Sequence, residues 1–349
     1  MNDSRLLVDI RNQERSLIKV LAAQIGGGRA QLTEAGRLLR SAQKIVITGI
    51  GASLHSAYPL YYELAGRGWN CTIVESAELL HYQERICAGA VVVVVSRSGE
   101  SVEIVKLLER LKPMAQSVIA VCNETDSTLA KEANVAVIVG SLPDEIVAVQ
   151  SYTGTVAAVL LLAGQAAGEF EKVRGEIADC LPQISRLIAE QLERISGWDD
   201  FYPVAAPIYF LGRGPSYASA LEGALLVGET AKEPAVGMAA GNFRHGPVEI
   251  VDSNFRGVVF AARGKTRALN IALARELERF GGRVRVIGQT GEDSGGLAMI
   301  GLPELTERIA PLVDIVPVQL AALRLAFVKG LEIGKFRHTG QVTRDEVGF

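Results

Sequence analysis

The stretch AVVVVVSRSGES, from Ala90 to Ser101, decides how the rest of the chain is interpreted. Five consecutive valines show no polar alternation, and a strand of this kind is typical of a parallel sheet that helices cover on both faces. The run ends in three serines around one glycine, and the sequence that follows, SVEIVKLLERLKP, has the apolar spacing of a helix. We therefore expect a buried strand, a serine-rich loop and a helix in direct succession.

The serine-rich loop lies where an open parallel sheet binds its ligands, beyond the carboxyl end of a strand and before a helix N-terminus. It would present backbone N–H groups and the hydroxyls of Ser96, Ser98 and Ser101, and Gly99 would let its backbone approach a ligand closely. Phosphate is the ligand that this arrangement suits. The alternative is that Ser101 only caps the helix and the other serines line a solvated loop.

Short apolar runs alternate with longer amphipathic stretches, which is the pattern of a parallel α/β sheet. The expected strands lie in KIVITGIG, CTIVES, AVVVVVSRS, SVIAVCN and VAVIVG, and later in PIYFLGRGPS, RGVVFAARGKT and RVRVIGQTGED. The two series align as an internal repeat. In this alignment the second copy has Ala262, Arg263, Gly264 and Lys265 where the first has Ser96, Arg97, Ser98 and Gly99.

The length of 349 residues and a hydrophobic content of 48% suggest about two domains with a large core. From Leu6 to Leu39 apolar residues recur at helical spacing, and the triple glycine Gly26 to Gly28 should separate two helices. We expect N-terminal helices in residues 1–40, a first α/β domain in 41–190 and a second domain with a C-terminal tail in 191–349.

Charge and cysteine usage narrow the class of protein. The net charge of −3 is spread without a basic stripe, so nucleic-acid and anionic-membrane partners are not expected. The polar N-terminus lacks the apolar core of a signal peptide, and no apolar run reaches membrane-spanning length. Four scattered cysteines without CxxC spacing fit a reduced compartment. We expect a cytoplasmic protein.

Cofactor and metal signals are weak. TGIGAS contains Gly49 and Gly51 after a strand, but the third glycine of a dinucleotide fingerprint would fall at Leu54. A nicotinamide oxidoreductase would rest only on these incomplete glycine loops, and we expect no cofactor. The four histidines are dispersed without a carboxylate cluster, so no metal site is expected.

Taken in order, GIGAS, SRSGES, GRGPSYASALEGALLVGE and FRHGPVEIVD make the chain resemble the SIS (sugar isomerase) family of the two-domain type, found in the isomerase half of glucosamine-6-phosphate synthase. The resemblance spans nearly the whole chain. It implies two tandem SIS domains, each a three-layer α/β/α, flavodoxin-like sheet. It also implies a homodimer with shared active sites that binds a sugar phosphate.

The resemblance assigns roles to individual residues. It implies that Glu229 moves a proton between C1 and C2, and that His245, contributed by the neighbouring subunit, assists ring opening. A carboxylate and a histidine suit such proton transfers, and Glu222, one heptad earlier, is the competing carboxylate. The residues that it implies for phosphate or sugar binding are Gly51, Ser53, Ser96, Ser98, Gly99, Ser101 and Ser151.

The chain departs from the synthase pattern at two positions. Where the synthase has lysine, this chain has Leu226 and Gln341. His338 and Gln341 belong to the tail KFRHTGQVTRDE, which by resemblance folds over the sugar site, and His338 could replace a missing lysine. The motif FRHGP also resembles that of the fructose-amino-acid-6-phosphate deglycases, although this chain has Asn242 where these usually have Glu. The start MNDSRLL has no Cys after Met1, so no glutaminase activity is expected.

Three functions remain open at this point. The first is an aldose–ketose isomerisation of a sugar or amino sugar 6-phosphate. The second is C–N cleavage of a ketosamine 6-phosphate by a deglycase or deaminase. The third is a phosphosugar sensor without catalysis, because SIS modules also serve as regulatory domains.

Overall fold

The computed structural model describes residues 1, 4–202, 207–333, 335–338, 340 and 342–345. The chain divides into two compact units, each assembled from segments that are distant in sequence. The first unit consists of residues 15–144, 150–178 and 336–349. The second unit consists of residues 1–14, 145–149 and 179–335.

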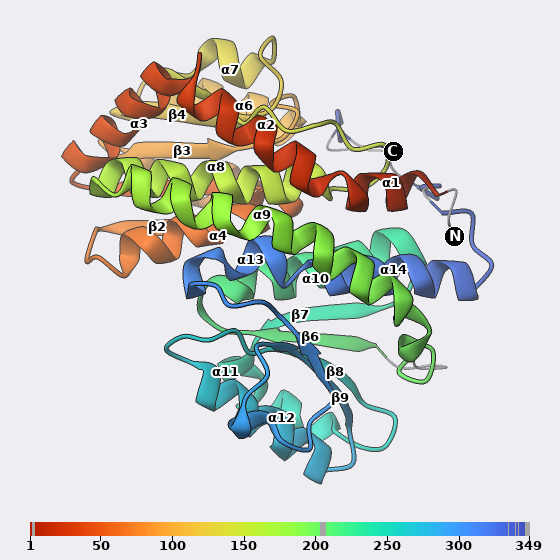
Figure 1. Ribbon diagram of the computed structural model, residues 1–349. Coiled ribbons are helices and arrows are strands. Elements are labelled where there is room, and N and C mark those ends of the chain that lie inside the picture. Colours follow the sequence, from red (N-terminus) through yellow and green to blue (C-terminus); the bar gives the residue numbers. More distant parts are fainter. Residues whose placement is uncertain (2–3, 203–206, 334, 339, 341, 346–349) are drawn as a thin grey trace. The chain divides into compact units, whose positions relative to one another are not determined.

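The first unit contains a parallel sheet with the strand order β2-β1-β3-β4-β5 (Figure 1). Its strands are β1 (Ile45–Gly49), β2 (Cys71–Glu75), β3 (Val91–Val95), β4 (Ser117–Cys122) and β5 (Val135–Ile138). Its helices are α2 (Gln13–Ile25), α3 (Arg29–Ser41), α4 (Ala52–Ala65), α5 (Ser76–Glu78), α6 (Val102–Leu111), α7 (Thr128–Glu132), α8 (Gln150–Ala167) and the first part of α9 (Phe170–Glu193). This strand order is the flavodoxin-like one.

All five valines of β3 are fully buried, which confirms the expectation drawn from the unbroken run. Val92 and Val94 belong to a core cluster with apolar residues of α6 and α7 on one face of the sheet. On the other face, α4 packs against β1, β2 and β3, and α8 packs against β4. A strand that is covered on both sides needs apolar residues at every position, and this explains the absence of alternation.

The second unit repeats the same topology in the order β7-β6-β8-β9-β10, again with all pairs parallel. Its strands are β6 (Ile208–Gly212), β7 (Ala235–Ala239), β8 (Arg256–Phe260), β9 (Arg283–Gly288) and β10 (Met299–Gly301). Its helices are α1 (Arg5–Arg11), α10 (Tyr217–Ala231), α11 (Ala240–Phe243), α12 (Arg267–Arg279), α13 (Ala310–Val313) and α14 (Val316–Val328). The expected pair of α/β sheets flanked by helices is confirmed.

The sheet register corrects the expected alignment of the two copies by one residue. β3 and β8 have equal length, and their first residues pair with the first residues of β1 and β6. The following helices, α6 and α12, then begin at equivalent positions, each eleven residues after its strand start. The aligned positions are therefore Ser98 with Arg263, Gly99 with Gly264 and Glu100 with Lys265.

The terminal segments are divided between the units. α1 belongs to the second unit, where the Gln13 side chain donates a 2.8 Å hydrogen bond to that of Gln319 on α14. α3 and most of α2 belong to the first unit. The expected break at the triple glycine is present between α2 and α3, and an additional break at Asn12 separates α1 from α2.

One apolar segment was missed by the sequence analysis. By length and composition, Glu307–Val328 could cross a membrane, with a mean hydropathy of 1.7. Of its most apolar window, however, 83% is buried inside the protein. A helix that is apolar on all sides and buried in this way is typical of the core of a globular protein.

All four cysteines are free thiols. Burial raises the pKa of Cys87 and of Cys122 to about 11 and that of Cys180 to about 12. These three thiols stay protonated near neutral pH, and a protonated thiol is a poor nucleophile and metal ligand. They therefore act as small apolar side chains of the core.

Candidate phosphate-binding site

The loop from Ser96 to Ser101 lies at the carboxyl edge of the first unit's sheet, between β3 and α6. Ser96 Oγ accepts a hydrogen bond from the backbone N–H of Gly99 (3.1 Å), and Ser98 Oγ accepts one from that of Glu100 (3.3 Å). A hydroxyl that accepts in this way still has its own proton to donate. The loop therefore fixes two hydroxyl groups and leaves each able to donate to a ligand oxygen.

Ser53 joins this loop from the neighbouring strand. It lies in the first turn of α4, directly after β1 and after Gly51, whose φ is +54°. Its Oγ accepts a hydrogen bond from the backbone N–H of Arg97 (3.2 Å). Ser101 occupies the N-cap position of α6, but its side chain makes no capping hydrogen bond. The structure thus offers no support for a purely capping role of Ser101.

Gly99 allows the loop to approach α7 closely. It has a φ of +65°, and a Cβ atom at this position would lie 2.4 Å from Oγ of Ser127. The backbone oxygen of Gly99 accepts a hydrogen bond from the N–H of Leu129 (3.2 Å). A side chain here would both strain the backbone and displace the loop from α7.

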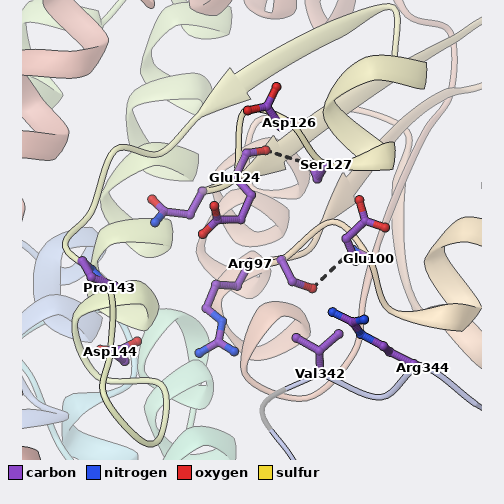
Figure 2. A pocket seen from close by; sticks show the side chains of 11 residues that line it. Arg97, Glu100, Glu124, Asp126, Ser127, Pro143, Asp144, Val342 and Arg344 are labelled. Atoms are coloured by element: carbon purple, nitrogen blue, oxygen red, sulfur yellow. Dashed lines mark hydrogen bonds between the residues drawn. The ribbon is translucent and has the colours of Figure 1, made fainter.

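A pocket of about 400 Å³ opens beside the loop (Figure 2). Its size is that of a small-molecule site. Ser98 is the member of the expected serine set that lines it, and Ser96 is buried within the loop. The lining residues are Arg97, Ser98, Glu100, Asn123, Glu124, Asp126, Ser127, Pro143, Asp144, Val342 and Arg344.

Two carboxylates of the pocket are held by backbone N–H groups at helix N-termini. Glu100 accepts hydrogen bonds from the N–H (2.5 Å) and the hydroxyl (3.0 Å) of Thr128. Asp144 accepts bonds from the N–H groups of Gln150 (2.7 Å) and Ser151 (3.1 Å), and also from the Ser151 hydroxyl. The buried Ser151 is therefore placed as a partner of Asp144.

Burial raises the pKa of Asp144, while the bonds from Ser151 and Gln150 and the charge of Arg97 act to lower it. The pKa of Asp144 stays above its ordinary value, so the hydrogen bonds and the charge of Arg97 offset only part of the cost of burying its charge. A carboxylate partly neutralised in this way repels a bound anion less than a solvated one would. Glu100 and Asp144 are compatible with a phosphate site because their oxygens accept hydrogen bonds from the N-termini of the helices next to it.

Two arginines line the same pocket, and the sequence analysis had not assigned a role to either. Arg97 lies within the serine loop, and Figure 2 shows its side chain on the side of the pocket where Asp144 lies. Arg344 comes from the C-terminal tail and lies near Glu100 in the same view. The signal for Arg97 was available, because a guanidinium inside a phosphate loop can form charge-assisted hydrogen bonds with an anion.

The C-terminal tail reaches this edge of the sheet. The backbone N–H of Val102 donates to the carbonyl of Thr343 (3.2 Å), and Val342 lines the pocket. His338 is exposed and is not among the lining residues. Gln341, the other expected tail contributor, lies outside the described residues.

The two expected catalytic residues lie in the second unit. Glu229 is half-buried in the last turn of α10, where its carbonyl accepts a hydrogen bond from the Lys232 ammonium. His245 is exposed in the turn after α11. Its backbone N–H donates a hydrogen bond to the backbone carbonyl of Asn242 (3.0 Å). The competitor Glu222 is buried in the middle of α10. Within the described ranges, no three His, Cys, Asp or Glu residues are grouped so that they could hold a metal ion.

Comparison with known proteins gives relatives over most of the chain. A relative from Pyrococcus horikoshii, an isomerizing glutamine–fructose-6-phosphate aminotransferase, is 28% identical over 326 residues, which cover 89% of this chain and 53% of the relative. The chain thus spans about half the length of the curated relatives that it matches.

Two solved structures share the fold. The tagatose-6-phosphate ketose/aldose isomerase of Escherichia coli superposes with a TM-score of 0.84 at 21% identity, covering 96% of both chains. The glucosamine-6-phosphate deaminase of Thermotoga maritima superposes with a TM-score of 0.76 at 19% identity, covering 97% of this chain and 99% of its own. The SIS domain model matches residues 38–164 and again residues 204–329. The chain therefore belongs to the SIS domain family.

Proposed function

We propose that the chain is a cytoplasmic, homodimeric enzyme that isomerises a sugar or amino sugar 6-phosphate between its aldose and ketose forms. The observation that carries the proposal is the serine loop, whose fixed hydroxyls lie beside a pocket of small-molecule size. The family supports the substrate class, and the E. coli relative in fold is itself a ketose/aldose isomerase of a sugar phosphate.

In this proposal the first unit holds the phosphate group. Ser53, Ser96, Ser98 and Ser101 donate hydroxyl protons to the phosphate oxygens. Arg97 adds a charge-assisted hydrogen bond, which is stronger than a bond between neutral groups. Because the substrate is anchored by a group that does not react, the same binding energy can orient C1 and C2 for proton transfer.

Glu229 is the proposed proton carrier. Its carboxylate removes the proton from one of the two carbons, giving an enediol, and returns it to the other, so that no atom is gained or lost overall. His245 of the neighbouring subunit exchanges a proton with the ring oxygen during opening, a task to which an imidazole ring is suited. Leu226 places an apolar side chain where the synthase has a lysine, so the proton shift would depend on this Glu and His pair.

A second candidate is the release of an amine from a ketosamine 6-phosphate. The deaminase from Thermotoga maritima favours it, because that fold relative cleaves a C–N bond in an amino sugar phosphate. Both reactions begin with the same C1/C2 proton transfer. Substrates with and without an amine at C1 or C2 therefore separate the two candidates.

The decisive experiment is NMR detection of deuterium exchange at C1 and C2 in D₂O, with a panel of sugar 6-phosphates and their amine adducts. Glu229→Gln is nearly isosteric, so binding should survive while exchange falls by roughly 100-fold or more. Glu222→Gln is the matched variant on the same helix and tests the competing carboxylate. Binding of a 6-phosphosugar without any exchange or amine release would contradict the proposed enzymatic activity and would indicate a phosphosugar sensor.

A further inference from the structure

The second unit has a counterpart of the serine loop that lacks the serines. β6 and β8 are neighbouring parallel strands with Leu211 opposite Val259, so the loops that follow them lie side by side at the carboxyl edge. The first loop leads into the short helix η4 (Gly214–Ser216), and the second leads into α12. These are the positions that hold Ser53 and the serine loop in the first unit.

A carboxylate of the protein occupies this place. Glu307, the first residue of the short helix η7 (Glu307–Ile309), accepts hydrogen bonds from the backbone N–H of Lys265 at both carboxylate oxygens, each at 3.2 Å. A Cβ atom built on Gly214 would lie 3.8 Å from Oε1 of Glu307. The carboxylate therefore lies between the two loops.

Gly264 makes room for this carboxylate. A Cβ atom at Gly264 would lie 2.1 Å from Cδ, 2.3 Å from Oε1 and 2.5 Å from Cγ of Glu307. Any residue larger than glycine would overlap the bound group. In the corrected alignment Gly264 corresponds to Gly99 of the serine loop, so both copies have a glycine at the same point of the loop.

The charges around Glu307 show that its role differs from that of its acidic neighbours. Glu304 pairs with the Arg263 guanidinium (2.7 Å), and Asp293 pairs with that of Arg267 (2.7 Å). Glu307 instead bonds the backbone of the loop, as a ligand would. In the described part of the chain, the Lys265 ammonium forms no ion pair and adds positive charge to this loop.

We propose that the β6 and β8 loops form a second anion site, which Glu307 fills as an internal ligand. Carboxylate and phosphate oxygens accept the same backbone N–H bonds, and loops before a helix N-terminus favour both. The site takes inorganic phosphate or a phosphomonoester once the carboxylate is withdrawn. This inference concerns the second unit alone and does not rest on the proposed isomerase activity.

The test is the number of phosphate ions bound per chain, measured by equilibrium dialysis against inorganic phosphate. Glu307→Ala should bind one more phosphate than the wild type. Glu304→Ala is the matched control, because it removes the same charge three residues earlier without emptying the site, and it should bind the wild-type number. An equal number in Glu307→Ala and wild type overturns the proposal. Loss of the serine-loop site would lower the number for every variant and leave the difference unchanged.

A second measurement, urea unfolding, reports the stability of each variant and tests whether Gly264 and Glu307 share one site. Gly264→Ala should expel the carboxylate, so it should destabilise the wild type strongly and a Glu307→Ala background, which lacks the overlapping atoms, much less. Additive effects of Gly264→Ala and Glu307→Ala on stability would show that the two residues do not share a site, which overturns the proposal.

Discussion

Replacing Gly99 by alanine tests whether the shape of the serine loop depends on a close approach to α7. The new methyl carbon would lie 2.4 Å from Oγ and 2.7 Å from Cβ of Ser127, and 3.0 Å from Cβ of Leu129. The positive φ of +65° costs about 1–2 kcal/mol for a residue with a Cβ, and the overlap adds about 1–3 kcal/mol. Gly99→Ala should therefore lower the free energy of unfolding by roughly 2–5 kcal/mol.

Gly89 supplies the matched control, because its φ of +67° is nearly the same and a Cβ there would have nothing within 4 Å. Gly89→Ala should cost only the backbone strain, about 1–2 kcal/mol, and should leave phosphosugar affinity unchanged. Urea unfolding measures the stabilities, and calorimetry with a 6-phosphosugar measures the affinity, which should fall in Gly99→Ala alone. Equal losses of stability in the two variants, with equal affinity, would refute the reasoning.

Three further predictions address binding, assembly and pH. Ser96→Ala with Ser98→Ala removes two donors to a charged acceptor, each contributing about 1.5–3 kcal/mol, so calorimetry should show phosphosugar affinity falling by roughly 100-fold or more; an unchanged affinity would exclude these serines. Mixing Glu229→Gln with His245→Ala, each inactive alone, should restore some activity in heterodimers, and failure despite proven subunit exchange would mean that each site is built within one chain. Burial raises the pKa of Asp314 from 3.8 to about 7, so the stability from its protonated form is complete below about pH 4 and is lost as the pH rises through 7. Asp314→Asn should remove this loss, which is at most about 4 kcal/mol, and unfolding curves that fall equally with pH in both proteins would contradict the assignment.

The strands that could be predicted are those whose burial requires a distinctive run of apolar residues in the sequence. β3 is covered on both faces and therefore reads as an unbroken run of valines. β7 and β10 were missed, since β7 is the short sequence AVGMA with a glycine at its centre and β10 has only three residues. Such strands owe their state to pairing with a neighbour rather than to their own residues.

The residues of the candidate site also fall into those that the sequence predicts and those that it does not. The hydroxyls of the serine loop could be predicted because local spacing places them after a strand and before a helix. The partners of Asp144 and the position of Arg344 could not, because they depend on segments that meet only in the folded chain. Glu307 was missed for the same reason, since 42 residues separate it from Lys265.

The division of the terminal segments between the units imposes an order of events during synthesis. α1 and the start of α2 are made long before the segment that they contact, since Gln13 is bonded to Gln319, which is added 306 residues later. At about 5–20 residues per second, a ribosome needs roughly 15–60 s to make that stretch. During this time the apolar side chains of α1, including Leu6, Leu7 and Ile10, lack the second unit that buries them in the finished protein. α1 is therefore a segment that a chaperone would find exposed on the growing chain.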